Sequence, residues 1–431
     1  MVKQASLVSF FQSVLEPNAI IAGERATDYS VDSLVPQVVV RPGSIEQVAA
    51  VIRLAHEAGT AVIPWGGGTM MRLGNPPARY DIALVLSRLN KIVEHEPADL
   101  TATIEAGCSL EALQNRLAAV GQFLPLDPPG GERATIGGLL AANASGPCRH
   151  AYGAVRDLAI GMRVVTADGR LAKAGGKVVK NVAGYDLCKL YIGSLGTLGV
   201  IVEATFKLWP LPRAQTTAYV PFHDGEEASR YAADLHRRGL ALRAIDLLNA
   251  TAAHRAGFEP RASYLIALWL AGAPAAVDRS LEEARETARS MGTDLSDVEH
   301  SDGQWERIRC LAAAEGVELL CKASLLPSRL PSLIAAAESL EEKPSLLARP
   351  TIGLAYLGWT AAPNDVGALA HLRDVVANLG GSLVIEACPG HFKADIDVFG
   401  PGRSDLELMR RIKHQFDPEG VLNPGRYVGR L

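Results

Sequence analysis

Three adjacent glycines, Gly66 to Gly68, stand directly after a short apolar strand pattern at residues 61–63, and Thr69 follows them. Glycine adopts positive φ freely and lets a ligand approach the backbone, although glycines in an ordered loop lose much conformational entropy on folding. Successive amides in such a turn form a concave nest that binds an anion, usually a phosphate. A plain tight turn is the alternative, but it seldom needs three glycines in a row. The run therefore predicts a phosphate site over residues 66–70.

The sequence around this run excludes two common nucleotide-binding loops. No Gly-Lys-Ser or Gly-Lys-Thr follows, so the run is not a P-loop. The glycines also come after a strand and a helix pattern, which Ser44 and Gln47 begin with a capping box. A Rossmann fingerprint would place Gly-x-Gly-x-x-Gly between a first strand and its helix, and that spacing is absent here. We therefore expect loop amides alone to hold the anion.

Two further stretches are rich in small residues. Residues 135–146 contain Thr135, Asn143 and Ser145 as their only hydrogen-bonding side chains, which suits a buried, extended ligand. A small-residue helix packed tightly on a sheet would also explain the middle of this stretch. Residues 193–201 hold glycines at a spacing that predicts a turn leading into a strand. Such a turn can clamp an aromatic base with its main-chain amides.

Length, charge and cysteines limit the class of protein. A chain of 431 residues is too long for one compact core and predicts two or three domains. The formal net charge of -4 argues against a nucleic-acid partner. The six cysteines form no C-x-x-C pair, which argues against an iron–sulfur cluster or another metal site and indicates reduced thiols in a cytoplasmic protein. We expect no signal peptide and no transmembrane segment, while attachment to the inner face of the membrane through partners stays open.

The pattern of the chain changes after Pro210-Leu211-Pro212, which we interpret as a domain boundary. Beyond it we expect strands near 215–221, 241–248, 264–271, 317–325, 351–359 and 382–387, and helices near 225–238, 275–290, 328–341 and 364–378. This is an α+β pattern with an antiparallel sheet backed by helices. We divide the chain into residues 1–213, residues 214–400 and a returning C-terminal segment, 401–431.

Several motifs, in order along the chain, carry a family resemblance. They are Pro42-Gly43-Ser44, the glycine stretches, Lys180-Asn181-Val182-Ala183-Gly184-Tyr185-Asp186, and the tail from Phe416-Asp417-Pro418 through Asn423-Pro424-Gly425-Arg426. Together they resemble the vanillyl-alcohol-oxidase type of FAD-binding (PCMH-type) protein and, within it, the D-lactate dehydrogenase and glycolate oxidase branch. The resemblance is strongest to the FAD-binding E-type subunits of bacterial glycolate oxidase and covers roughly residues 35–213 and 400–431.

The resemblance implies an α+β fold: a two-subdomain PCMH-type FAD-binding domain, and an α+β cap domain with an antiparallel sheet that covers the flavin. FAD would lie extended. By position, its pyrophosphate would be bound beside Trp65 by Gly66, Gly67, Gly68, Thr69 and Met70. The flavin and ribityl chain would be lined by Pro128, Pro129, Thr135, Gly138, Ser145 and Gly146. The adenosine half would contact Gly153, Gly196, Gly199, Val200 and Ile201, and the flavin edge would lie near Asn423.

Some relatives attach FAD covalently through a histidine beside the glycine run. Here Pro64-Trp65-Gly66 stands at that place without a histidine, and nothing in the sequence fixes Cys148 against the flavin. We therefore expect non-covalent FAD. Trp65 and Tyr185 could stack on the flavin ring, or equally pack at the edge of a core.

Oxidation of a 2-hydroxy acid needs a base for the hydroxyl proton, a cation for the carboxylate and the flavin as hydride acceptor. Catalytic members of the branch carry a histidine-rich string, His-x-Gly-Asp-Gly-Asn-x-His in outline, which this chain lacks. The catalytic residues therefore stay unassigned, with His150 and His391 as the histidines best placed to face the flavin. Arg156, Arg133 and Lys180 are candidate partners of the carboxylate or of the reduced flavin, and a solvated surface charge is the alternative for each.

These observations leave three hypotheses. The first is the FAD-binding subunit of a glycolate oxidase complex that converts glycolate to glyoxylate, beside a catalytic flavoprotein subunit and an iron–sulfur subunit, in an electron-transfer or supporting role. The second is a self-sufficient FAD-dependent dehydrogenase of a small 2-hydroxy acid. The third is a cofactor-free interaction scaffold, against which the glycine run argues because a scaffold has no use for phosphate-binding amides.

Overall fold

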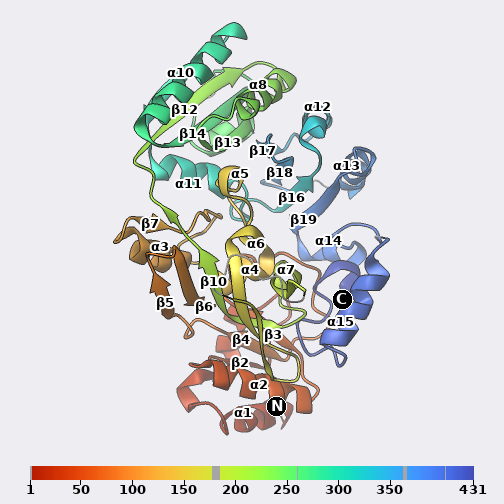
Figure 1. The fold of residues 1–431 in the computed structure, drawn as a ribbon. Coiled ribbons are helices and arrows are strands. Elements are labelled where there is room, and N and C mark those ends of the chain that lie inside the picture. Colours follow the sequence, from red (N-terminus) through yellow and green to blue (C-terminus); the bar gives the residue numbers. More distant parts are fainter. Residues whose placement is uncertain (1, 177–184, 260, 363–365, 403) are drawn as a thin grey trace.

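Three sheets are stacked along the molecule, as Figure 1 shows for the computed structural model. The structure describes residues 2–176, 185–259, 261–362, 366–402 and 404–431. The N-terminal half forms the two smaller sheets, and the middle of the chain forms the largest one. Helix α15 (Leu406–Phe416) then returns to the N-terminal half, where Phe416 packs edge-on against Tyr191. No helix among the described residues is both long and apolar enough to cross a membrane.

The first sheet provides the strand that leads into the glycine run. Its order is β1 (Ile20–Ala22), β2 (Val38–Val40), β4 (Ile82–Val85) and β3 (Val62–Trp65). Strands β2, β4 and β3 are parallel, and β1 is antiparallel to β2. Helix α2 (Ile45–Glu57) covers the sheet with its apolar face, and α1 (Val2–Phe11) packs beside it.

Ser44 caps α2 as predicted, but the amide that donates to the Gln47 side chain is that of Gly43 and not that of Ser44. The Gln47 amide donates to Ser44 Oγ over 3.2 Å, and the Gly43 amide donates to Gln47 Oε1 over 2.7 Å. Two of the N–H groups at this helix end are thereby satisfied. This fixes the direction in which α2 enters the layer above the first sheet.

The second sheet is antiparallel throughout and carries two helices of the candidate site. Its order is β5 (Ile92–Glu96), β6 (Thr101–Glu105), β10 (Val200–Lys207), β8 (Ala159–Val165) and β9 (Leu171–Gly175). Helices α3 (Leu110–Ala118) and α4 (Ile136–Ala142) share its apolar core. The remaining short elements are α5 (Arg149–Tyr152), α6 (Val155–Leu158), α7 (Leu187–Tyr191), and the pair β7 (Gln122–Phe123) and β11 (Trp209–Pro210).

The third sheet has eight antiparallel strands, and we call the part of the chain around it the cap. The strand order is β15 (Ser296–Glu299), β12 (Ala214–Phe222), β14 (Tyr264–Gly272), β13 (Leu242–Asn249), β17 (Ser345–Arg349), β18 (Leu354–Trp359), β16 (Leu319–Ser324) and β19 (Ser382–Ala387). The outer face packs on α8 (Gly225–Arg237), α10 (Pro274–Ser290), α12 (Leu330–Glu338) and α13 (Val366–Asn378). The inner face packs on α9 (Ala250–Arg255), α11 (Asp302–Cys310) and α5.

The remaining elements are short. They are α14 (Gly390–Asp395) and the 3-10 turns Pro17–Ala19, Gly23–Tyr29, Pro327–Arg329 and Val428–Arg430.

The α+β class with an antiparallel cap sheet is confirmed, but the sequence prediction lacks the strands β15 and β17 and the helices α9 and α11. The strand expected over 351–359 begins only at Leu354, because residues 350–353 form the turn that joins it to β17. Gly353 has φ +67° in this turn, and a Cβ there would lie 1.9 Å from the Leu325 carbonyl oxygen. The strand predicted to follow the turn at residues 193–201 is β10, which ends at Lys207, and Trp209 pairs with β7.

We predict that Ser44→Ala lowers the free energy of unfolding by about 1 kcal/mol, because the Gln47 amide loses its acceptor at the start of α2. Urea denaturation of both proteins measures the difference. The exposed Ser404→Ala is the matched control and should leave the midpoint unchanged. Equal midpoints for Ser44→Ala and the wild type would show that the cap contributes nothing.

Candidate functional site

Residues 66–74, which we call the glycine loop, leave β3 at Trp65. The backbone of the loop lies against the segment that precedes α4. A Cβ on Gly66 would lie 2.2 Å from Thr135 Oγ1, and one on Gly67 would lie 1.7 Å from the Arg133 carbonyl oxygen. Gly68 has φ +74°. Two of the three glycines are therefore required by close packing and the third by its backbone conformation.

The amides of the glycine loop are free for a ligand. Among the described residues, the structure shows no hydrogen-bond acceptor for the backbone amides of residues 66–71, and these residues are half-buried. Backbone amides in folded proteins are almost always paired with protein or water. Consecutive free amides at the end of a buried strand fit the diphosphate of a dinucleotide.

Of the eleven buried side-chain atoms that lack partners among the described residues, three belong to the small-residue stretch or the C-terminal tail. Asn143 Oδ1, Ser145 Oγ and Asn423 Oδ1 have no hydrogen bond in the structure. A buried polar atom left unpaired costs about 1 to 3 kcal/mol, so such atoms indicate a missing partner. Ser145 and Asn423 are among the residues predicted to contact FAD, and Asn143 belongs to the same small-residue stretch. These atoms fit a polar ligand.

The three small-residue stretches come together at one end of β3. The amides of Gly193 and Leu195 donate to the carbonyls of Leu140 and Ala141 at the end of α4, both over 2.9 Å. Gly196, with φ +72°, packs on Pro64 of β3.

The C-terminal tail joins this group. Asn423 Nδ2 donates to the Leu195 carbonyl over 2.6 Å, and the Asn423 amide donates to the Val62 carbonyl over 2.8 Å. Segments that are far apart in the sequence thus form one frame around the free polar atoms.

The other residues expected at the cofactor have structural contacts that explain their type. Thr135 caps α4, because its Oγ1 accepts from the Gly138 amide over 3.4 Å. A Cβ on Gly146 would lie 1.7 Å from the Asp127 carbonyl oxygen. Gly153 has φ +83°. Gly199 packs on Val164, and the next two residues, Val200 and Ile201, are buried at the start of β10.

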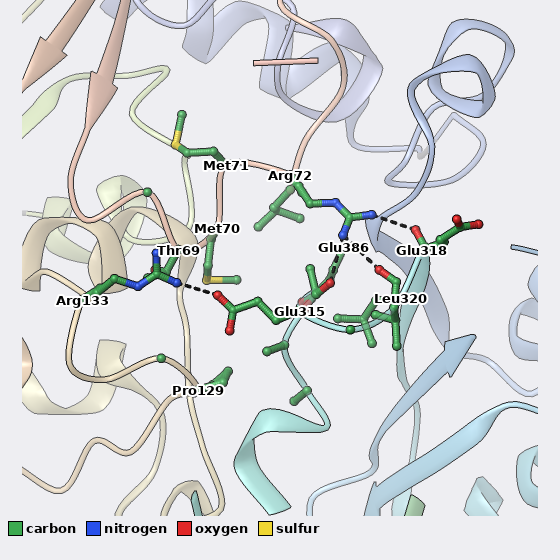
Figure 2. Close-up of a pocket in the computed structure, with 18 of the residues that line it drawn as sticks. Thr69, Met70, Met71, Arg72, Pro129, Arg133, Glu315, Glu318, Leu320 and Glu386 are labelled. Atoms are coloured by element: carbon green, nitrogen blue, oxygen red, sulfur yellow. Dashed lines mark hydrogen bonds and ion pairs between the residues drawn. The ribbon is translucent and has the colours of Figure 1, made fainter. Parts of the chain in front are cut away.

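A cavity of about 690 Å³ lies where the glycine loop meets the cap (Figure 2). Thr69, Met70 and Pro129 line it on one side, and residues 312–318 and Glu386 on the other. Pro128 lines a separate cleft of about 610 Å³, next to Asp127 and Arg243.

Two arginines bridge the cavity to the cap, as Figure 2 shows. Arg72 donates to the carbonyls of Ala314, Val317 and Glu318 over 2.8 to 3.1 Å. Arg133 forms an exposed ion pair of 2.5 Å with Glu315. The candidate anion partner Arg133 therefore has an acidic partner on the cap, although such an exposed pair contributes little to stability.

The inner face of the cap sheet carries charged groups that the sequence prediction missed. Lys322 Nζ lies 3.2 Å from Glu386, and Arg349 Nε lies 3.6 Å from Asp246. Arg349 is fully buried and donates through Nη1 to the Ser145 carbonyl over 3.4 Å. Each of these charged residues stands in a mostly apolar strand. A charge within an apolar strand pattern is the sequence signal that could have marked them.

The charges on this face have perturbed pKa values. Burial raises the pKa of Asp246 to about 7, although Arg349 opposes the shift. Tyr356 and Glu386 raise the pKa of Lys322. The cations on this face therefore stay charged near neutral pH. Among the described residues, no cluster of three or more His, Cys, Asp or Glu side chains could hold a metal ion.

The weak catalytic candidates lie on three different helices. His150, on α5, shares a hydrogen bond of 2.6 Å between Nδ1 and Thr351 Oγ1. His391 is exposed on α14 and packs edge-on against Phe392, and Arg156 is exposed on α6. None of these observations assigns a catalytic role.

The two aromatic candidates differ in exposure. Trp65 packs edge-on against Tyr29, with ring centroids 5.3 Å apart, whereas Tyr185 is 96% exposed. The remaining candidate, Lys180, lies outside the described residues.

Comparison with known proteins agrees with this geometry. The FAD binding domain family matches residues 36–175, and the FAD linked oxidase C-terminal domain family matches residues 363–427. D-lactate dehydrogenase of Archaeoglobus fulgidus is 30% identical over 91% of this chain and 92% of its own length. The chain belongs to the FAD-linked oxidases. It is therefore an FAD-dependent oxidoreductase, and FAD is its cofactor.

Two further comparisons agree with this assignment. The "Glycolate oxidase subunit GlcD" of Bacillus subtilis is 25% identical over 91% of this chain and 88% of its own length. The solved structure of p-cresol methylhydroxylase with substrate bound has a TM-score of 0.76 at 16% identity, and the match covers 98% of this chain and 96% of that one. That structure supports the fold alone. This chain therefore has the PCMH-type FAD-binding fold together with an antiparallel sheet domain.

We predict that Gly67→Ala lowers the affinity for FAD about tenfold or more, because the new methyl group collides with the Arg133 carbonyl and shifts the loop amides. Titration of deflavinated protein with FAD, followed by flavin fluorescence, measures this. Gly131→Ala is the matched control, since a Cβ there meets nothing closer than 3.9 Å. Equal losses in both variants would contradict the explanation.

We also predict that the free energy of unfolding depends on pH through His150, which lies where α5 meets the cap. Burial, with His236 nearby, lowers the pKa of His150 to about 4. A histidine in the unfolded chain titrates near pH 6.5, so the unfolded state takes up its proton first as the pH falls from about 6.5 to 4. Stability is therefore lost across that window.

In His150→Gln this titration is absent. The loss of unfolding free energy between pH 7 and pH 5 should then be smaller than in the wild type by on the order of 1 kcal/mol. Urea denaturation at the two pH values measures it, and the exposed His223→Gln should follow the wild type. The same pH dependence in His150→Gln would refute the assignment.

Proposed function

We propose that this chain is the FAD-binding subunit of a complex that oxidises a 2-hydroxy acid, with glycolate oxidised to glyoxylate as the reaction to test first. One observation carries the proposal. A frame for FAD faces a cap sheet whose strands β13 and β16 to β19 contain no histidine. On that face Lys322 pairs with Glu386, and Arg349 Nε lies 3.6 Å from Asp246 without a hydrogen bond between them.

Different residues of this chain would bind different parts of the cofactor. Amides of residues 66–71 would bind the diphosphate, and the unpaired oxygens of Asn143, Ser145 and Asn423 would bind the polar atoms of the ribityl chain and the ring edge. FAD, when bound, supplies a two-electron acceptor at this interface. We expect the attachment to be non-covalent, because no histidine stands beside the glycine loop.

A partner would supply what this chain lacks. A base for the hydroxyl proton of the substrate typically contributes about 10² to 10⁴ in rate. The strands of the cap sheet that face the frame carry no histidine, so we assign the base to a catalytic flavoprotein subunit and onward electron transfer to an iron–sulfur subunit. Asp246, whose pKa burial raises to about 7 and whose carboxylate oxygens have no hydrogen bond, is the base that this chain itself would offer in the second candidate function below. Similarity to a protein named as a glycolate oxidase subunit supports a complex of this type.

A second candidate function is a self-sufficient dehydrogenase of another 2-hydroxy acid. The 30% identity to a D-lactate dehydrogenase over nearly its whole length favours it. Buried Arg349 also favours it, because its Nη2 has no hydrogen-bond partner and could receive a substrate carboxylate. A cofactor-free scaffold is disfavoured by membership of an FAD-binding family.

Anaerobic mixing of the FAD-loaded protein with glycolate and with D-lactate tests the proposal. The isolated chain should show flavin absorbance. Substrate should reduce its flavin about a hundredfold or more slowly than the flavin of the complex purified from its native host. Mass spectrometry of that complex should identify a second flavoprotein and an iron–sulfur protein. Rapid reduction of the isolated chain by glycolate would refute the subunit role. Rapid reduction by D-lactate, lost in Arg349→Met, would establish the second candidate.

A further inference from the structure

Behind the glycine loop lies a buried group of three charges, Asp32, Lys393 and Arg426, which we call the charge triad. Lys393 is 0% exposed and Arg426 is 3% exposed. Lys393 Nζ lies 2.8 Å from Asp32 Oδ1, and Arg426 Nη1 lies 3.2 Å from Asp32 Oδ2. The three residues come from the N-terminal segment, from α14 and from the C-terminal tail. Two cations and one carboxylate leave one net positive charge.

The two cations bind the carbonyl groups at the C-terminal end of the glycine loop. Arg426 Nη2 donates to the carbonyls of Met71 and Leu73, over 2.9 and 2.6 Å. Arg426 Nη1 donates to the Asn75 carbonyl over 3.3 Å, and Lys393 Nζ donates to the Arg72 carbonyl over 2.7 Å.

These contacts fix the orientation of the loop. Each peptide unit is planar and trans, so its N–H points opposite to its carbonyl. The carbonyls of Met71, Arg72 and Leu73 point toward the charge triad, so the amides of the same peptide units, those of residues 72–74, point away from it. This fixes the C-terminal end of the loop. Trp65 in β3 holds the other end of the loop, and the free amides of residues 66–71 lie between the two anchors.

The arrangement is costly, which argues that it serves more than stability. Asp32 and Ser33 have φ +46° and +71°, a left-handed conformation that is unfavourable for residues other than glycine. Buried charges also lose their hydration, and buried ion pairs seldom stabilise a fold more than apolar residues would. The single carboxylate of Asp32 does not balance both cations. Burial consequently lowers the pKa of Arg426 to about 10 and also lowers that of Lys393.

We propose that Asp32, Lys393 and Arg426 are positioning residues for FAD, which hold the carbonyls of the glycine loop from behind and place one net positive charge beside the cofactor diphosphate. An anion in front of the loop would balance that charge. The inference rests on FAD binding by this family and not on glycolate as the substrate, so it can fail while the proposed function stands.

Equilibrium binding to the deflavinated full-length protein tests this. In Arg426→Gln the dissociation constant for FAD should rise about tenfold or more, while that for riboflavin, which has no phosphate, should stay the same. Arg426→Lys keeps the charge but not the forked donor geometry. Its dissociation constant for FAD should therefore lie between those of the wild type and Arg426→Gln. Arg79→Gln is the matched control, because Arg79 ties the tail to the N-terminal half through the carbonyls of Gly59 and Gly420 without touching the loop.

A second measurement separates positioning from folding. Thermal unfolding without FAD should be nearly the same for Arg426→Lys and the wild type, and the rise in melting temperature on adding FAD should be smaller in the variant. Asp32→Asn provides an independent variant should Arg426→Gln fail to fold. Unchanged FAD affinity in folded Arg426→Lys and Asp32→Asn would overturn the proposal, as would equal losses of FAD and riboflavin affinity or a matching loss in Arg79→Gln.

Discussion

The glycine loop lies backbone against backbone on the segment before α4, and the rest of the cofactor frame depends on that contact. Only residues without a Cβ permit it, since Gly67 comes closer to the Arg133 carbonyl than any side chain would allow. The contact brings the end of β3 to the start of α4. The turn at residues 193–196 then binds the end of the same helix through two short hydrogen bonds. A shift of the loop would disturb the whole frame.

Two arginines, one on each side, form hydrogen bonds between the cap and this frame. At the cavity, Arg72 donates only to backbone carbonyls of the cap, so the contact depends on the path of the chain and not on side-chain type. At the second place a buried guanidinium, Arg349, reaches the Ser145 carbonyl of the small-residue stretch. The small-residue stretch thus meets a cap face that carries two cation–carboxylate neighbours, Lys322 with Glu386 and Arg349 with Asp246.

Local patterns accounted for what could be predicted from the sequence. The N-cap at Ser44 and the helices on the outer face of the cap are encoded by neighbouring residues. The strand β17 was missed because its residues have no alternation that distinguishes them from a loop, and the turn before Leu354 was read as strand. The inward charges of the cap could not be placed, since the sequence does not say which strand face meets the other domain. Lys393 and Asp32 are separated by 361 positions, and only the folded chain brings them together.

The return of the tail to β3 has a consequence for biogenesis. Val421 and Asn423 pair with Val62, and Arg426 reaches the glycine loop, so the phosphate-binding loop gains its final support from residues synthesised more than 340 positions later. The ribosome releases the N-terminal strands long before that support exists. The complete frame for the flavin therefore exists only after the tail has been translated and has folded back onto β3.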